Sequence, residues 1–220
     1  MPYATSALIG YLLGMLNPSY ILARLYGFDI RDRGSGNAGA SNAMLLFGKL
    51  RGALCAVFDI AKSAGAVCLT RALFPGDPLV FSVTATACIL GHIFPFYMRF
   101  RGGKGLACLA GTILAYDIRV FAIMLACEAV IALATSYICF VPMTAAVAFP
   151  FVYGFMMRSI PGTLLLGVVA AVVLYRHAEN IRRIRMGREM RLAYLWDREG
   201  ETARMKANYP EDEWDHPERE

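Results

Sequence analysis

Residues 79–98 read LVFSVTATACILGHIFPFYM and contain no Lys, Arg, Asp or Glu. A helix needs about 20 predominantly apolar residues to cross the hydrocarbon core of a bilayer, so this stretch is long enough for one span. Comparable stretches recur along the chain, which predicts an all-α integral membrane protein. We expect about seven transmembrane helices, although the short fourth segment also allows six, at residues 3–25, 50–72, 79–98, 104–117, 118–138, 139–157 and 160–181.

The composition excludes an ordinary soluble domain. Of the 220 residues, 57% are hydrophobic, against about 45–50% in soluble domains. We divide the chain into a membrane domain at 1–191 and a charged cytoplasmic tail at 192–220. The six cysteines form no Cys-x-x-Cys pair and are expected as small buried hydrophobes, so neither a metal nor a cofactor is predicted. The net charge of +5 gives little support for nucleic-acid binding, because no soluble basic face is expected.

Lys and Arg are distributed unevenly between the two ends of the predicted spans. With seven spans, one side receives only Arg71, Arg119 and Arg158, and the other side carries many more. Cytoplasmic loops hold an excess of Lys and Arg, so the bias predicts an external N-terminus and a cytoplasmic C-terminus. The net charge of +7 over residues 1–176 and −2 over residues 177–220 suits a membrane body that meets anionic lipid or anionic substrate.

The first of two glycine-rich loops, DIRDRGSGNAGASN at residues 29–42, follows the first span. Glycine lets the backbone approach an anion closely, and hydroxyl, amide and guanidinium groups can donate hydrogen bonds to it. The alternative is a plain interfacial turn in which Ser and Asn cap helices. The anion-binding interpretation assigns substrate contacts to Gly34, Gly36, Asn37, Gly39 and Asn42 and places Ser35 among them.

The second loop, FRGGKG at residues 100–105, follows the third span, and Lys104 would begin the next helix. The arrangement is similar to a phosphate loop in its physics, but the GxxxxGK[ST] pattern is absent and nucleotide binding is unsupported. No acid follows His92 at the spacing of a His–Asp acyltransferase dyad, since position 97 is Tyr97. We assign substrate contacts to the residues around Lys104, namely His92, Arg101, Gly102, Gly103 and Gly105.

A third polar cluster, HAENI at residues 177–181, closes the last span. His177 and Asn180 share one helix face, where His177 could orient or deprotonate a hydroxyl and Asn180 could donate to an oxyanion. The alternative is an interfacial helix end bonded to backbone or water. Asp59 and Lys62 lie at i and i+3 within the second span, and charges at that depth usually pair or face a polar cavity. We predict an ion pair that lines the site.

These clusters resemble the bacterial acyl-phosphate:glycerol-3-phosphate acyltransferases. The resemblance covers roughly residues 8–190 and rests on three motifs in the same order, at Gly34–Asn42, at Gly91–Pro95 with Phe100–Ala107, and at His177–Ile181 with Gly187 and Glu189. It implies a multi-pass enzyme of the bacterial inner membrane, with its site toward the cytoplasm, that passes a fatty acyl group from acyl phosphate to the 1-hydroxyl of glycerol 3-phosphate. The products would be lysophosphatidic acid and phosphate, for phospholipid synthesis.

By this resemblance the catalytic residues are Ser35, Lys104, His177 and Asn180. Several positions depart from the family pattern, and two of these departures concern polar contacts with substrate. The family commonly carries an Arg where this chain has Leu45, a loss for which Lys49 or Arg51 could substitute, and the Ser-rich stretch after its Thr-x-Tyr is replaced by Cys139–Pro142. Two alternatives stay open: a small-anion transporter, which anion-binding loops beside spans would also serve but which the lack of an internal repeat disfavours, and an inactive scaffold descended from the enzyme, which the departures allow.

Overall fold

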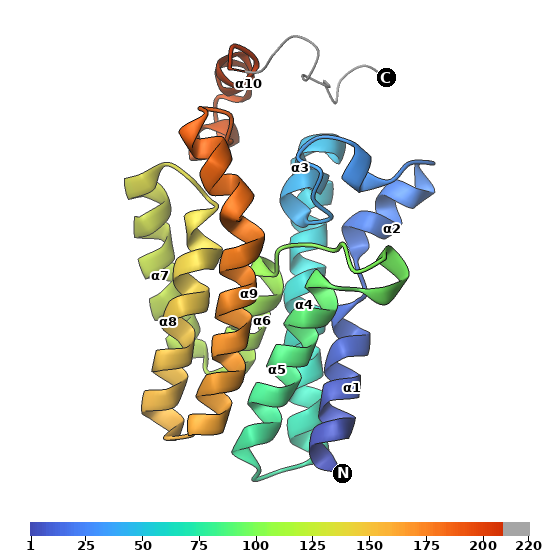
Figure 1. Cartoon of the computed structure of the whole chain (residues 1–220), viewed down its shortest axis with the longest axis vertical. Helices are drawn as coiled ribbons and strands as arrows, with labels where there is room; N and C mark the ends of the chain where they lie inside the picture. The colour runs from blue at the N-terminus through green and yellow to red at the C-terminus, as the bar shows by residue number, and fades with distance from the viewer. Residues whose placement is uncertain (209–220) are drawn as a thin grey trace.

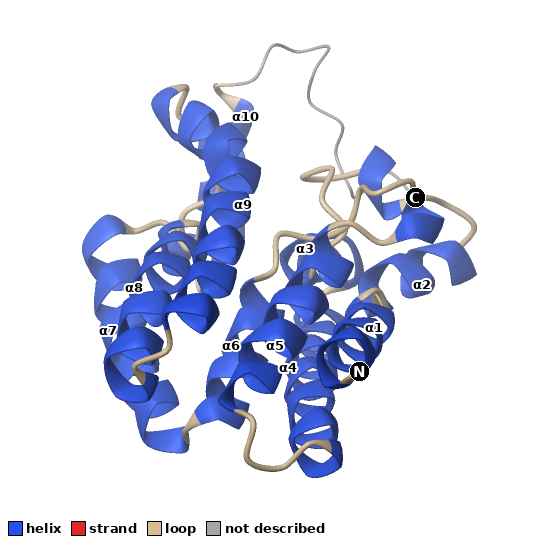
Figure 2. Ribbon diagram, turned by 60° about the horizontal axis from the view of Figure 1, so that its bottom comes forward, coloured by secondary structure: helices blue, strands red, loops and turns tan. Residues whose placement is uncertain are grey.

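The computed structural model describes residues 1–208, and residues 209–220 of the predicted tail lie outside the described part. The described chain contains helices and no strands, which confirms the all-α prediction (Figure 2). Its α-helices are α1 (Pro2–Gly14), α2 (Pro18–Leu25), α3 (Ala40–Phe47), α4 (Lys49–Leu73), α5 (Pro78–Ile93), α6 (Leu106–Tyr116), α7 (Ile118–Thr135), α8 (Phe140–Met157), α9 (Ile160–Arg185) and α10 (Arg198–Lys206). Three short 3-10 helices lie at Ile30–Asp32 (η1), Phe96–Met98 (η2) and Leu192–Leu195 (η3).

Six helical segments within the described residues are long and apolar enough to cross a membrane: Pro2–Leu25, Lys49–Leu73, Pro78–Met98, Ile118–Thr135, Phe140–Met157 and Ile160–Arg185. The segment predicted at 104–117 is the short helix α6. At 1.5 Å per residue, its eleven residues extend about 16 Å, roughly half of a 30 Å hydrocarbon core. The predicted seven spans thus correspond to six full-length segments and one half-length helix.

The first predicted span is interrupted where α1 passes into α2. The side chain of Asn17 accepts a hydrogen bond from the Tyr20 backbone N–H at 2.8 Å, and Pro18 is the first residue of α2. Proline has no N–H to continue the ladder of α1, whereas it fits the first turn of a new helix. The amide of Asn17 also donates to the carbonyl oxygen of Ala38 at 2.8 Å. The break therefore ties the first span to the first glycine-rich loop.

Close helix contacts depend on small residues. A Cβ added at Gly14 would lie 2.0 Å from the carbonyl oxygen of Cys88, where α1 meets α5. A Cβ at Gly111 would lie 2.1 Å from the carbonyl oxygen of Ile60, where α6 meets α4. Membrane helices gain little from hydrophobic association with one another, so such close backbone packing supplies much of their cohesion.

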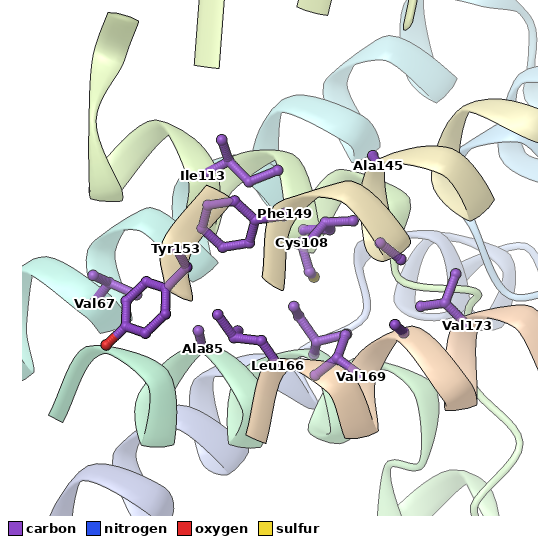
Figure 3. Packing of buried hydrophobic residues seen from close by; sticks show 14 of the residues in the cluster. Val67, Ala85, Cys108, Ile113, Ala145, Phe149, Tyr153, Leu166, Val169 and Val173 are labelled. Carbon is purple, nitrogen blue, oxygen red and sulfur yellow. The ribbon is translucent and has the colours of Figure 1, made fainter. Parts of the chain in front are cut away.

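A second packing region joins α5, α6, α8 and α9 (Figure 3). The rings of Phe81 and Tyr153 stack with centroids 5.4 Å apart, and Phe149 meets Phe81 edge-on at 6.2 Å. The hydroxyl of Tyr153 donates to the carbonyl oxygen of Pro78 at 2.9 Å, so its polar end is satisfied. Leu166 and Val169 of α9 pack against the same cluster. This core fixes α9, and with it the third polar cluster, against α5 and α6.

The helices run between two ends of the molecule (Figure 1). In that view the N-terminus and the α4–α5 and α8–α9 connections lie at the lower end, and α3, the α7–α8 turn and α10 lie toward the upper end. The α5–α6 connection crosses the upper half. Both glycine-rich loops and the C-terminal end of α9 therefore lie in the same half of the molecule.

Candidate active site

Residues from all three predicted clusters line one cavity of about 360 Å³. Ten of the predicted site residues line it: Gly34, Ser35, Asn37, Gly39, Asp59, His92, Lys104, Gly105, His177 and Asn180. The other predicted residues, Gly36, Asn42, Lys62, Arg101, Gly102 and Gly103, are not part of this lining. The structure thus brings together segments that are far apart in sequence.

Asn42 determines the conformation of the first loop. Its side-chain oxygen accepts from the Ser35 backbone N–H at 2.9 Å, and its amide donates to the carbonyl oxygens of Ile30 at 2.9 Å and Arg33 at 3.0 Å. The side chain is buried, so removing it would leave buried backbone groups unpaired. Gly34 and Gly36 have φ values of 60° and 69°, which glycine adopts without strain.

Arg31 connects the first loop to the second. Its guanidinium donates to the carbonyl oxygens of Met98 at 2.6 Å and Arg101 at 3.3 Å. Asp29 holds the guanidinium in place, with 2.8 Å from Nε to Oδ1 and 2.6 Å from Nη2 to Oδ2. This bidentate hydrogen bonding lowers the pKa of Asp29 despite its partial burial. The pair is a structural brace between the two glycine-rich loops.

The second loop folds back along the end of α5. The backbone N–H groups of Gly102 and Gly103 donate to the carbonyl oxygens of Ile93 at 2.9 Å and His92 at 3.1 Å. A Cβ added at Gly103 would lie only 2.1 Å from Nε2 of His92. Only glycine fits there. The close approach of the loop to His92 places Lys104 in the cavity lining, just before α6 begins.

Lys104 begins a chain of polar contacts across the cavity. Its ammonium donates to Oδ1 of Asn180, and Nδ2 of Asn180 donates to Oε1 of Glu189 at 2.7 Å. Nε of Arg183 donates to the other oxygen of Glu189 at 2.9 Å. Burial, reinforced by the charge of Arg183 and opposed by that of Glu189, lowers the pKa of Lys104 to about 8. The lysine is therefore protonated at neutral pH and loses its charge in mildly alkaline solution.

Glu189 and Arg183 were not among the predicted site residues, yet both line the cavity. Glu189 entered the sequence analysis only through the family resemblance, and no motif singled out Arg183. Arg183 follows Asn180 by three residues, and that spacing places both on one face of α9. Nη1 of Arg183 also donates to the carbonyl oxygen of Ser35 at 3.4 Å.

His177 is held in one tautomer. Its Nδ1 lies 2.8 Å from the carbonyl oxygen of Val173. A carbonyl oxygen can only accept, so Nδ1 carries the hydrogen and Nε2 is left as an acceptor. The side chain is buried and lines the cavity. The arrangement suits a group that accepts a hydrogen bond from a hydroxyl.

The predicted ion pair of Asp59 and Lys62 is present, with 2.6 Å between Oδ1 and Nζ, and it includes His92. Nδ1 of His92 lies 3.1 Å from Nζ of Lys62 and 3.5 Å from Oδ1 of Asp59. Ligand atoms of Asp59, His92 and Cys108 also lie within 4.8 Å of one another. The ammonium of Lys62 neutralises that carboxylate and would repel a metal ion, so the group does not suit one.

The two departures lie at the cavity wall, where Leu45 and Pro142 present apolar surface. Neither predicted substitute for an arginine at position 45 joins them in the lining. Nζ of Lys49 donates to the carbonyl oxygen of Leu195 at 2.7 Å, and the guanidinium of Arg51 lies 5.6 Å from the centroid of the Tyr26 ring. Arg183 is one of the cations that do line the cavity.

Comparison with known proteins gives consistent matches. A family model described as glycerol-3-phosphate acyltransferase matches residues 4–187. The chain is 40% identical over 182 residues to the glycerol-3-phosphate acyltransferase of Rubrobacter xylanophilus, across 83% of this chain and 91% of that protein. It is 33% identical over 186 residues to that of Thermotoga petrophila, across 84% and 94%.

Solved structures agree with these matches. The crystal structure of PlsY (YgiH), an integral membrane glycerol 3-phosphate acyltransferase, in its glycerol 3-phosphate form matches with a TM-score of 0.80 at 30% identity, across 88% of this chain and 96% of that one. Its lysophosphatidic acid form matches with a TM-score of 0.75 at 31% identity.

Proposed function

Because the chain belongs to the glycerol-3-phosphate acyltransferase family, we propose that it transfers a fatty acyl group from acyl phosphate to the 1-hydroxyl of glycerol 3-phosphate. The products are lysophosphatidic acid and inorganic phosphate. One observation carries the proposal: the amide-rich loop around Ser35, the ammonium of Lys104, and the His177–Asn180 face line a single cavity. The reaction brings two phosphate groups and one hydroxyl together, and these residues offer partners for each.

Lys104 and Arg183 supply the positive charge for a phosphate group. Both line the cavity and are linked through Asn180 and Glu189. A buried cation attracts an anion more strongly than an exposed one, since less water screens the interaction. Donor groups of the first loop, including the hydroxyl of Ser35, can donate to the second phosphate or to the carbonyl oxygen as charge develops on it.

His177 positions the nucleophile. Its Nε2 accepts a hydrogen bond from the 1-hydroxyl, which directs the hydroxyl oxygen toward the acyl carbon. The bond from that oxygen to the acyl carbon forms as the bond from the acyl carbon to the phosphate oxygen breaks. The hydroxyl proton ends on the released phosphate. An acyl phosphate is already activated, so positioning and charge stabilisation supply most of the rate.

The acyl chain lies along the apolar part of the cavity wall. Met44, Leu45, Leu106, Ile138 and Pro142 belong to this part of the lining. The excess of Lys and Arg at the same end of the helices supports a site that faces the cytoplasm of a bacterial inner membrane. Membrane lipids surround the exposed apolar side chains of the outer helix faces.

The donor is tested with purified protein in detergent, given glycerol 3-phosphate and either acyl phosphate or an acyl thioester. We expect lysophosphatidic acid to form with acyl phosphate as the donor and not with the acyl thioester. Lys104→Ala should lower kcat/KM by about 100- to 1,000-fold, the usual loss for one preorganised donor. Arg119→Ala removes the same charge at the opposite end of the bundle and should have little effect. Product from the thioester alone, or equal losses in the two variants, would contradict the proposal.

A further inference from the structure

The segment after α9 contributes to the cavity although it lies beyond the family match. The match ends at residue 187, and the cavity lining extends to Tyr194, Thr202 and Met205. The backbone N–H of Leu192 donates to the carbonyl oxygen of Ser136 at 2.7 Å, which docks the segment on the α7–α8 turn. Within the described chain, residues 188–206 thus form one wall of the site.

The sequence of α10 explains why a helix forms at this position. Asp197 caps it by accepting from the Gly200 backbone N–H at 2.9 Å. Glu199 and Glu201 lie in its first turn, and Arg204 and Lys206 lie in its last, as the helix dipole favours. Nine residues are too few for a stable isolated helix, so α10 depends on its contacts with the rest of the chain.

Those contacts converge on the turn that carries Glu189. Nη1 and Nη2 of Arg204 donate to the carbonyl oxygens of Gly187 and Glu189, each at 2.6 Å. Glu201, which is only 5% exposed, accepts from the Arg191 backbone N–H at 2.8 Å. Glu201 and Arg204 bind each other through two contacts of 2.5 and 3.0 Å. The pair therefore fixes the backbone on both sides of Glu189.

We propose that Glu201 and Arg204 are positioning residues for the acyl-transfer site, acting through Glu189 on Asn180 and Lys104. The steps are all direct contacts: Arg204 to the Glu189 backbone, the Glu189 carboxylate to Asn180 and Arg183, and Asn180 to Lys104. Glu189 is the one residue in this series whose backbone is held by α10 and whose side chain enters the cavity. The activity readout of this inference rests on the proposed function.

The pH profile provides a readout that a merely structural role would not move. The charged groups around Lys104 are Arg183 and Arg176, which lower its pKa, and Glu189 and Glu179, which raise it. If the Glu189 turn is released, its carboxylate contributes less and the pKa of Lys104 falls further. The alkaline limb of kcat/KM for glycerol 3-phosphate then moves to lower pH.

The test compares Arg204→Ala with Lys206→Ala, which removes the same charge from the same turn at an exposed position. We expect Arg204→Ala to lower kcat/KM about tenfold, as coupled neighbours commonly do, and to move the alkaline limb to lower pH. Glu189→Gln should do the same, and adding Arg204→Ala to it should cause no further loss. Lys206→Ala should behave as wild type. Equal effects of Arg204→Ala and Lys206→Ala, or fully additive losses with Glu189→Gln, would overturn the proposal.

Two further measurements separate this proposal from other failures. Hydrogen exchange of the amides in residues 187–191 should be faster in Arg204→Ala and unchanged in Lys206→Ala, whether or not the protein turns over substrate. Unchanged exchange in Arg204→Ala would refute the role of Arg204 in fixing the backbone around Glu189, whereas an inactive wild type with the expected exchange would refute only the proposed function. Glu201→Gln keeps an acceptor for the Arg191 N–H and weakens the ion pair. It should give a smaller loss in the same direction, and an unaltered pH profile would count against the proposal.

Discussion

Replacing Gly103 by alanine places a methyl group against the ring of His92. The new Cβ would lie 2.1 Å from Nε2, 2.9 Å from Cε1 and 3.0 Å from Cδ2. An ordinary contact needs about 3.4 Å or more, so the two groups must separate by about 1.3 Å. The His92 ring cannot withdraw easily, because it is buried and its Nδ1 lies 3.1 Å from the Lys62 ammonium. The loop must move instead, and Lys104 is the next residue.

A displacement of about 1 Å in a positioning group costs roughly 100-fold in rate, and overpacking a filled site costs about 1–3 kcal/mol of stability. We therefore expect Gly103→Ala to lower kcat/KM about 100-fold, measured as phosphate release in detergent, with a modest fall in Tm. Gly65→Ala in α4, where an added Cβ meets nothing within 4 Å, is the matched control. Wild-type kcat/KM in Gly103→Ala, or a loss of activity no larger than the loss of folded protein, would contradict this expectation.

Three other changes have defined outcomes. The ammonium of Lys104 is charged below its pKa of about 8, so kcat/KM for glycerol 3-phosphate should fall as the pH rises through 8. In Lys104→Arg the fall should come at higher pH, and a flat wild-type profile to pH 10 would contradict the assignment. Leu45→Arg should lower the KM for glycerol 3-phosphate by adding a cation to the cavity wall, and an unchanged KM would dismiss that idea. Asn42→Ala leaves three hydrogen-bonding partners without the side chain and should cost about 2–3 kcal/mol at roughly 1 kcal/mol each, seen as a lower Tm in thermal unfolding.

Hydropathy predicts the long helices because the thickness of the bilayer core largely sets the length of an apolar span. The stretch at 79–98 corresponds to α5 and η2, and that at 160–181 to the body of α9. The same measure cannot show the break at Asn17, because it arises from one side-chain bond to Tyr20 and from the missing N–H of Pro18. It also overestimates the segment at 104–117, whose helix begins at Leu106 and ends at Tyr116.

The candidate site was predictable where a residue type already suggests its chemistry. Lys104 after a glycine pair and His177 with Asn180 on one helix face both carry such a signal, and both line the cavity. Arg183 and Glu189 carry no such signal, because a charged residue near the end of a span is usually explained by the orientation of the span in the membrane. Glu201 and Arg204 act through backbone carbonyls far along the chain, and only the folded structure shows those contacts.

Asn42 illustrates a further limit of sequence reasoning. Its place in the first loop suggests a ligand contact, whereas its side chain makes three hydrogen bonds that hold the loop itself. An amide can serve either purpose, and the choice depends on which backbone groups the fold brings within reach. A role of Asn42 in binding substrate remains a prediction, and its role in shaping the Ser35 backbone is what the structure shows.

In the proposed reaction, the cavity around Lys104 and His177 transfers an acyl group from acyl phosphate to glycerol 3-phosphate. Phosphorus NMR of one reaction follows acyl phosphate, glycerol 3-phosphate, lysophosphatidic acid and inorganic phosphate together. We expect lysophosphatidic acid and phosphate to rise in equal amounts, only when both substrates are present, and to vanish in Lys104→Ala. Phosphate release without lysophosphatidic acid, or no change in either signal with the wild-type protein, would contradict that proposal.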